Sequence, residues 1–275
     1  MNTPIDTLHL FPRLNNMLID FLRALPEDDW HKPTVARQWR VKDVAAHLLD
    51  GNFRRIALHR DGWTVRPGMP INSYNDLVQY LNMLNADWVK AMKRLSPQIL
   101  IDLLRQTNED VYRLFSSLDP YAEAAWAVSW AGESKSYNWF DLAREYTERW
   151  LHQQQIRDAL GNRELLAREL YHPFLTIFLQ GWPHTLSNLD ADEGTLLKTT
   201  ITGVGGGDWY LLQSNGEWKL SRGGKRPVAE TTINGDLAWK LFSKSIRKED
   251  LDGGVDIKGN TQLGEKILDM ISVMA

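Results

Sequence analysis

Two residues in one polar stretch of the chain have the types and the spacing of metal ligands. Residues 141–161 read DLAREYTERWLHQQQIRDALG. Glu148 and His152 are four residues apart in it, so in a helix their side chains lie one turn apart on the same face. They offer a carboxylate oxygen and an imidazole nitrogen to a single metal ion, which leaves open where a third ligand comes from.

The same stretch carries the pattern of one long amphipathic helix. Apolar residues recur at three- and four-residue steps, the helical period, and they are Leu142, Tyr146, Trp150 or Leu151, Ile156 and Leu160. Gly161 supplies the residue that most readily turns left-handed and ends a helix. We therefore expect the two ligand candidates on a single rigid element.

The candidate for the third ligand is His47, which lies in the apolar stretch VAAHLL. Two histidines and one carboxylate suit zinc with an open fourth position, and also iron(II), nickel or manganese. Two ordinary explanations of these residues compete with a metal site. A lone buried histidine often hydrogen-bonds a carbonyl group, and a Glu/His pair four apart is often a helix-surface pair. Spacing by itself does not decide between them.

The elements that must position these residues are mainly helical. Helical periodicity runs from residue 5 to about 188, with helices expected near 10–25, 41–60, 75–95, 97–119 and 141–161. A further helical stretch at 165–186 contains Pro173 and Pro183, so we expect it to be kinked or broken.

The character of the chain changes at a polar linker, residues 187–194. Short β-prone runs follow at 196–202, 209–213, 217–221, 229–233 and 255–258, with helices expected at 237–243 and 262–274. Asn215-Gly216 between two such runs is a hairpin signal. The sequence thus predicts a mainly α protein with two domains, a helical bundle at 1–188 and a smaller α+β domain at 189–275.

Composition narrows the function classes. The 275 residues have a formal net charge of −3 and contain no cysteine. This charge gives no reason to expect nucleic acid or an anionic membrane as a partner, and the lack of cysteine excludes disulfides, thiolate metal sites and a cysteine nucleophile. We find no signal peptide and no apolar run of the roughly 20 residues that cross a bilayer. A cytoplasmic protein is the expectation.

Two motifs resemble those of the DinB/YfiT-type four-helix bundles. Trp39, Asp43 and His47 match a Trp-x-x-x-Asp-x-x-x-His pattern, and Glu148 and His152 open a match that continues through Gln153-Gln154, Ile156-Arg157 and Ala159-Leu160-Gly161. The sequence is most similar to the mycothiol-dependent maleylpyruvate isomerase-like branch over about the first 165 residues. The remainder looks like the small sterol-carrier-like domain of that branch. The resemblance implies that His47, Glu148 and His152 bind a divalent metal, usually zinc.

The resemblance also implies an activity. A low-molecular-weight thiol binds the metal as its thiolate and attacks a small electrophile, so that the enzyme is a maleylpyruvate-type cis-trans isomerase or a thiol S-transferase. Arg54 and Arg55 are candidates to bind substrate carboxylates, although solvated surface arginines are their commoner state. Arg247 is our candidate for a basic residue of the smaller domain that meets the substrate. The branch usually has Asp where this chain has Gln155, so an acidic partner that orients the His152 ring is missing.

Two rival functions remain open at the level of sequence. The chain could be a binding module with a structural metal and an apolar ligand in the smaller domain, or a metal-dependent hydrolase that uses bound water in place of thiol. Members of the family are often dimers, so a homodimer is an expectation, but the sequence defines no interface. The aromatic residues Trp126, Trp130, Tyr137 and Trp139 are candidates for a pocket wall, although such clusters are more often ordinary core.

Overall fold

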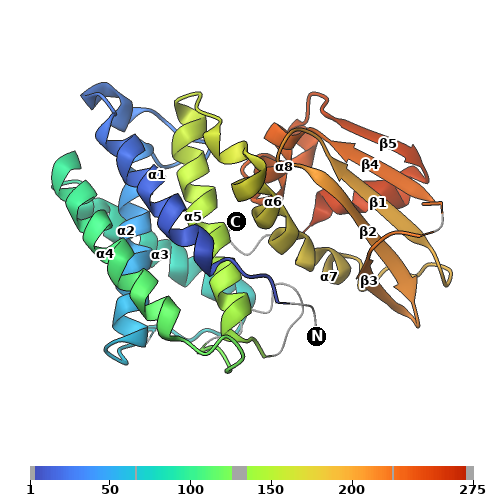
Figure 1. The fold of residues 1–275 in the computed structure, drawn as a ribbon, viewed down its shortest axis with the longest axis horizontal. Helices are drawn as coiled ribbons and strands as arrows, with labels where there is room; N and C mark the ends of the chain where they lie inside the picture. Colours follow the sequence, from blue (N-terminus) through green and yellow to red (C-terminus); the bar gives the residue numbers. More distant parts are fainter. Residues whose placement is uncertain (1–3, 66, 126–134, 225, 271–275) are drawn as a thin grey trace. The chain divides into compact units, whose positions relative to one another are not determined.

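The computed structural model describes residues 4–65, 67–125, 135–224 and 226–270. Helices occupy the first two thirds of the chain, and a sheet with short helices follows (Figure 1). This confirms the predicted fold class, a helical bundle with a smaller α+β part. Trp126 and Trp130 of the proposed pocket wall lie outside the described residues. Among the described helices, none is long and apolar enough to cross a membrane.

The helices of the bundle follow the predicted pattern closely. They are α1 (Phe11–Arg23), α2 (Val41–His59), α3 (Tyr74–Met92), α4 (Pro97–Ser117) and α5 (Asn138–Ala159). Ser96 caps α4 as its side chain accepts a hydrogen bond from the backbone N–H of Ile99, at 3.3 Å. Pro97 then occupies the first turn, where its missing N–H has no partner to lose. The start of α4 is therefore encoded locally.

The chain divides into two compact units. One comprises residues 8–118 and 152–162, and the other comprises residues 1–7, 119–151 and 163–275. The helix α5 contributes residues to both of them. The predicted domain division after residue 188 stays a prediction.

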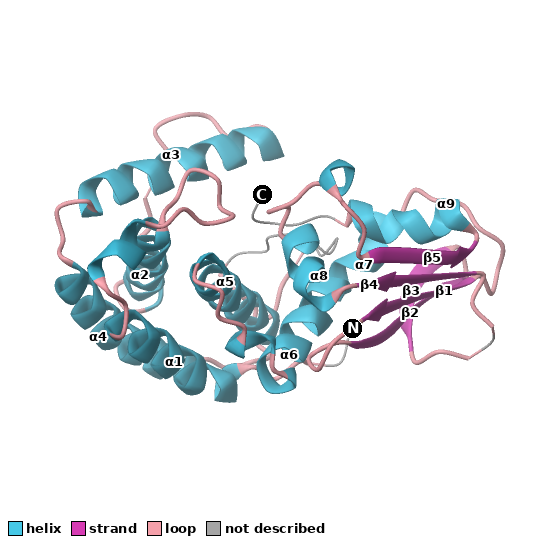
Figure 2. Ribbon diagram, turned by 90° about the horizontal axis from the view of Figure 1, so that it is seen from above, coloured by secondary structure: helices cyan, strands magenta, loops and turns pink. Residues whose placement is uncertain are grey.

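The core of the first unit is formed by the apolar faces of α1, α2 and α4 with the last turns of α5. Its fully buried members include Val41, Leu49, Leu100 and Ile156. The buried guanidinium of Arg157 joins α5 to α1, as it donates a hydrogen bond to the Met17 carbonyl at 2.9 Å and lies 4.3 Å from the centre of the Phe21 ring. The helix α3 lies beside α2 (Figure 2). The indole N–H of Trp88 on α3 donates a hydrogen bond to the Ala46 carbonyl of α2 at 2.7 Å.

In the second unit, the predicted helical stretch at 165–186 is broken, as expected. It forms α6 (Arg168–Phe178), a 3₁₀ turn and the short α7 (Trp182–Thr185), with Pro183 in the first turn of α7. Within this unit Trp150 of α5 stacks on Tyr171 of α6, with ring centres 5.0 Å apart. The first part of α5 is thus packed against α6 by aromatic contacts.

The sheet has five strands in the order β3-β2-β1-β4-β5 (Figure 1). They are β1 (Leu196–Ile201), β2 (Gly207–Ser214), β3 (Glu217–Ser221), β4 (Ala229–Ile233) and β5 (Val255–Gly259). β1 and β4 pair in parallel, and the other neighbours are antiparallel. Asn215 and Gly216 both have positive φ, 54° and 76°, as the turn of a two-residue hairpin requires. The hairpin predicted from Asn-Gly is confirmed.

Helices α8 (Gly235–Phe242) and α9 (Thr261–Gly264) complete this unit. The helix predicted at 262–274 is wrong in its extent, because α9 ends at Gly264 and a 3₁₀ turn covers Glu265–Asp269; residues 271–274 lie outside the described ranges. The carbonyl of Gly264 accepts a hydrogen bond from the Thr231 hydroxyl at 2.8 Å, and a Cβ at Gly264 would lie 2.4 Å from Ile257. Close packing on the sheet therefore outweighs helix propensity in this segment.

Candidate metal centre

The helix α2 turns His47 into the interior. The carboxylate of Asp43 accepts a hydrogen bond from the backbone N–H of Arg40 at 3.0 Å, which caps the start of the helix. Val44 and Leu48 flank His47 and are buried, and the histidine itself is only 4% exposed. The apolar surroundings that the sequence predicted for His47 are confirmed.

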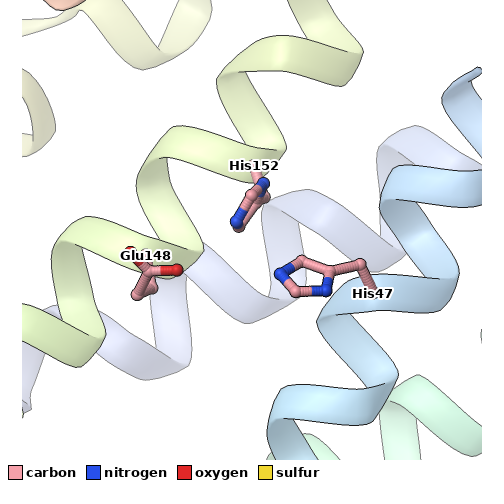
Figure 3. Close-up of side chains that lie close together, drawn as sticks. All are labelled: His47, Glu148 and His152. Carbon is pink, nitrogen blue, oxygen red and sulfur yellow. The ribbon is translucent and has the colours of Figure 1, made fainter. Parts of the chain in front are cut away.

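The side chains of His47, Glu148 and His152 point toward one another (Figure 3). One ligand atom from each lies within 4.8 Å of the others. The two imidazole rings meet edge to face, with centres 4.6 Å apart and planes at 76°. Figure 3 shows the outer nitrogen of the His47 ring turned toward the other two side chains.

Burial keeps His47 in the protonation state that a ligand needs. The pKa of His47 is held well below its ordinary value of 6.5, first by burial, then by the neighbouring charges of His152 and Arg54. His47 is therefore neutral at pH 7, and a neutral imidazole has a lone pair to give to a metal.

Gln155 contacts the ring of His152. Its side-chain oxygen Oε1 lies 2.9 Å from Nδ1 of His152, and both residues are buried. Because an amide oxygen only accepts, Nδ1 carries the proton and Nε2 carries the lone pair. The acidic partner that the sequence lacks is thus replaced by an amide that fixes the tautomer in the same way. The spacing of three residues on one helix was the signal available in the sequence.

Trp39 belongs to the site, although the sequence did not reveal its role there. Its ring centre lies 4.7 Å from that of His47 and 6.3 Å from that of His152. Trp39 is part of the Trp-x-x-x-Asp-x-x-x-His motif, but the motif does not determine the orientation of the indole ring.

The two candidate anchors on α2 have different surroundings. The guanidinium of Arg54 forms an ion pair with Asp50 at 3.1 Å, and its charge lowers the pKa of His47, so it lies near the cluster. The guanidinium of Arg55 lies 5.8 Å from the ring centre of Phe115. Arg247 is exposed and precedes a 3₁₀ turn at Lys248–Asp250. The substrate roles assigned to these three arginines stay predictions.

The donor set fits a divalent transition metal. Two imidazoles and one carboxylate match catalytic zinc sites that keep a position open, and they also match sites for iron(II), nickel and manganese. Ligands that project inward from facing helices are a recurrent way of building a metal site in a helical bundle. The fold and the site together define a helical bundle with a candidate metal site.

Comparison with known proteins places this bundle in a family. The family model described as the mycothiol maleylpyruvate isomerase N-terminal domain matches residues 11–157, more than half of the chain. The chain belongs to this family, as its motifs predicted. A comparison with curated protein sequences gave no significant match.

Solved structures share the fold over most of the chain. Crystal structures titled as the mycothiol-dependent maleylpyruvate isomerase and as a mutant of it match with TM-scores of 0.55 and 0.54. Each match covers 91% of this chain and 91% of the other, at 11% and 10% identity. At such low identity the structural similarity establishes the fold alone. The activity has to be inferred from the residues of the site.

Proposed function

We propose that this protein is a divalent-metal-dependent enzyme that uses a low-molecular-weight thiol, either as a maleylpyruvate-type cis-trans isomerase or as a thiol S-transferase. The observation that carries the proposal is the convergence of His47, Glu148 and His152, with ligand atoms within 4.8 Å of one another. The family and the solved structures supply the thiol and the isomerisation, because the relatives are named as mycothiol-dependent maleylpyruvate isomerases. Zinc is the metal we expect first.

Each residue of the cluster has a defined task in this proposal. His47 is neutral because burial lowers its pKa, and His152 presents Nε2 because its Nδ1–H is bonded to Gln155. Glu148 contributes a negative charge that offsets part of the cation's charge. A divalent cation held there would stabilise the thiolate form of a bound thiol at neutral pH.

The reaction balances without an oxidant or a reductant. The sulfur forms a C–S bond to one carbon of an activated C=C bond, whose electron pair moves into the adjoining carbonyl group. The remaining single bond rotates, the electron pair returns, and the C–S bond breaks to release the thiolate. In a transferase the thiolate displaces a leaving group, and the C–S bond remains. This chain has no cysteine, so the sulfur comes from a free thiol.

Metal content and thiol dependence together test the proposal. Purified protein should contain near-stoichiometric metal, and a His47→Ala/His152→Ala double variant should contain almost none. The matched control is His172→Ala/His184→Ala, which removes two histidines outside the cluster and should retain the metal. The loaded protein should then isomerise maleylpyruvate only when mycothiol is added.

The outcomes separate the rival functions. A wild type that stays empty after incubation with zinc, nickel, iron(II) or manganese contradicts the enzyme proposal and leaves a binding scaffold. A loaded protein that hydrolyses esters or amides without thiol supports a metal-dependent hydrolase.

A further inference from the structure

His47 differs from His152 in how its ring is held. The Nδ1 atom of His47 is buried and, among the residues that the structure describes, has no hydrogen-bond partner. Histidines that bind metals usually donate their second ring N–H to an acceptor, which fixes the orientation of the ring. His152 has such an acceptor in Gln155, at 2.9 Å. Within the described residues, the ring of His47 is therefore held by ring contacts and not by a hydrogen bond at Nδ1.

The indole of Trp39 is placed to do this. Its ring centre is 4.7 Å from that of His47 with the planes at 44°, and 6.3 Å from that of His152 with the planes at 42°. Centroid separations of 4.5–7 Å are those of interacting aromatic pairs. One indole thus contacts both imidazoles of the cluster.

Trp39 is itself held by a compact loop. The backbone N–H of Trp39 donates to the Ala36 carbonyl at 2.7 Å. The Trp39 carbonyl accepts two hydrogen bonds from Thr34, from its backbone N–H at 3.1 Å and its hydroxyl at 2.9 Å. Both backbone groups of Trp39 are therefore satisfied before α2 begins at Val41, which restricts the directions in which the indole points.

We propose that Trp39 is a positioning residue that orients the His47 ring, and with it the histidine pair, for metal binding. It would act through ring contact where Gln155 acts through a hydrogen bond. The inference rests on the proposed function, because the orientation matters only if the cluster binds an ion.

The first test measures Co²⁺ binding by the visible absorption spectrum, which reports the ligand geometry independently of activity. Trp39→Leu should weaken Co²⁺ binding by about 10- to 100-fold, the usual effect of losing a group that orients a ligand, and should change the band shape. Trp39→Phe keeps a ring and should restore most of the affinity and the wild-type spectrum.

The matched control is Trp88→Leu. Trp88 is also half-buried and packs on α2 through its hydrogen bond to Ala46, but it does not belong to the cluster. It should leave the Co²⁺ affinity and spectrum unchanged. If Trp39→Leu behaves like Trp88→Leu, the inference is wrong. Should Trp39→Leu fail to fold, Trp39→Met fills similar space without a ring and takes its place.

A second readout uses metal-free protein and separates this inference from the metal proposal. The ring-proton NMR signals of His47, identified by their loss in His47→Gln, should be sharp in the wild type and in Trp39→Phe. Exchange between ring orientations should broaden them in Trp39→Leu, and unchanged signals there would overturn the inference. If the wild type binds no Co²⁺ and the signals still broaden in Trp39→Leu, the metal proposal is contradicted and the positioning role of Trp39 is supported.

Discussion

At the residue scale, the imidazole rings of the two histidines of the cluster are held in their states by different physical means. His152 has its proton placed on Nδ1 by the amide oxygen of Gln155. His47 is kept neutral by burial, which lowers its pKa, and its ring lies against Trp39. Each mechanism has its own measurable signature.

The lowered pKa of His47 predicts how stability depends on pH in the metal-free protein. The unfolded histidine takes up a proton near pH 6.5, whereas the folded one resists it. The neutral His47 ring makes its full contribution to stability above pH 6.5. Below this pH the free energy of unfolding should fall, by at most about 1.4 kcal/mol per pH unit. Urea titrations between pH 5 and 8 measure this slope.

His47→Gln should flatten that slope. His172→Gln is the comparison, because the pKa of the half-buried His172 is also lowered, chiefly by burial, and its removal should have a smaller effect. A slope that is the same in His47→Gln and in the wild type would show that His47 titrates normally in the folded protein.

Gln155 offers a second prediction at this scale. Gln155→Leu removes the acceptor for the Nδ1–H of His152 and should weaken zinc binding by about 10- to 100-fold. Gln155→Glu keeps an acceptor and adds a negative charge beside the ring of His152, so it should bind zinc at least as tightly as the wild type. Competition with a chromophoric chelator measures both affinities. Equal affinities for the Leu and Glu variants would contradict the assigned role.

The neighbouring arginines of α2 should differ in their effect on turnover. Arg54 lies near His47, where its charge acts on the imidazole, whereas Arg55 lies over the Phe115 ring. Arg54→Gln should raise the KM for maleylpyruvate about tenfold or more, as expected for loss of a charge-assisted hydrogen bond to a carboxylate, with metal content unchanged. Arg55→Gln should leave KM close to the wild-type value. If Arg55→Gln raised KM more than Arg54→Gln, Arg55 and not Arg54 would be the residue that binds the substrate carboxylate.

At the element scale, α5 departs from an ordinary amphipathic helix. More of its buried residues are polar than apolar. Several of these groups are paired within the helix, as in the buried ion pairs Asp141–Arg144 and Glu145–Arg149, both at 3.2 Å. A buried charge is tolerated when it is paired and hydrogen-bonded. This pairing lets a buried helix carry Glu148 and His152 among polar neighbours.

Two glycines test how closely the elements pack. A Cβ at Gly206, in the loop between β1 and β2, would lie 1.9 Å from the Ile201 carbonyl oxygen, whereas one at Gly51 in α2 meets nothing within 4 Å. Gly206→Ala should cost about 1–3 kcal/mol or more, because the backbone must shift. Gly51→Ala should stabilise by about 0.5–1 kcal/mol, because alanine loses less backbone entropy in a helix. Urea denaturation measures the free energy of unfolding of both variants. Equal changes in the two variants would contradict the close packing at Gly206.

At the scale of the whole molecule, metal binding should stabilise the fold. A ligand at 100 times its Kd adds about 2.7 kcal/mol to the free energy of unfolding. For a chain of this size that corresponds to a rise in Tm of roughly 5–10 °C. Chelation should remove the rise, and zinc should restore it. Calorimetry of His152→Ala is the control, and a zinc-dependent rise that persists in this variant would place the ion elsewhere.

The sequence by itself determined the features that depend on local geometry. Glu148 and His152 share a face because four residues make about one helical turn, and Asn215-Gly216 forms a hairpin because both residues accept positive φ. The start of α4 and the break at Pro183 follow from the same local rules.

The tertiary structure decided what depends on packing between distant segments. No local rule brings His47 next to His152, more than a hundred residues away, because helix packing sums many small contacts over whole faces. The position of Trp39 against the two imidazoles follows from that packing. The early end of α9 has the same origin, since contact with the sheet there outweighs helix propensity.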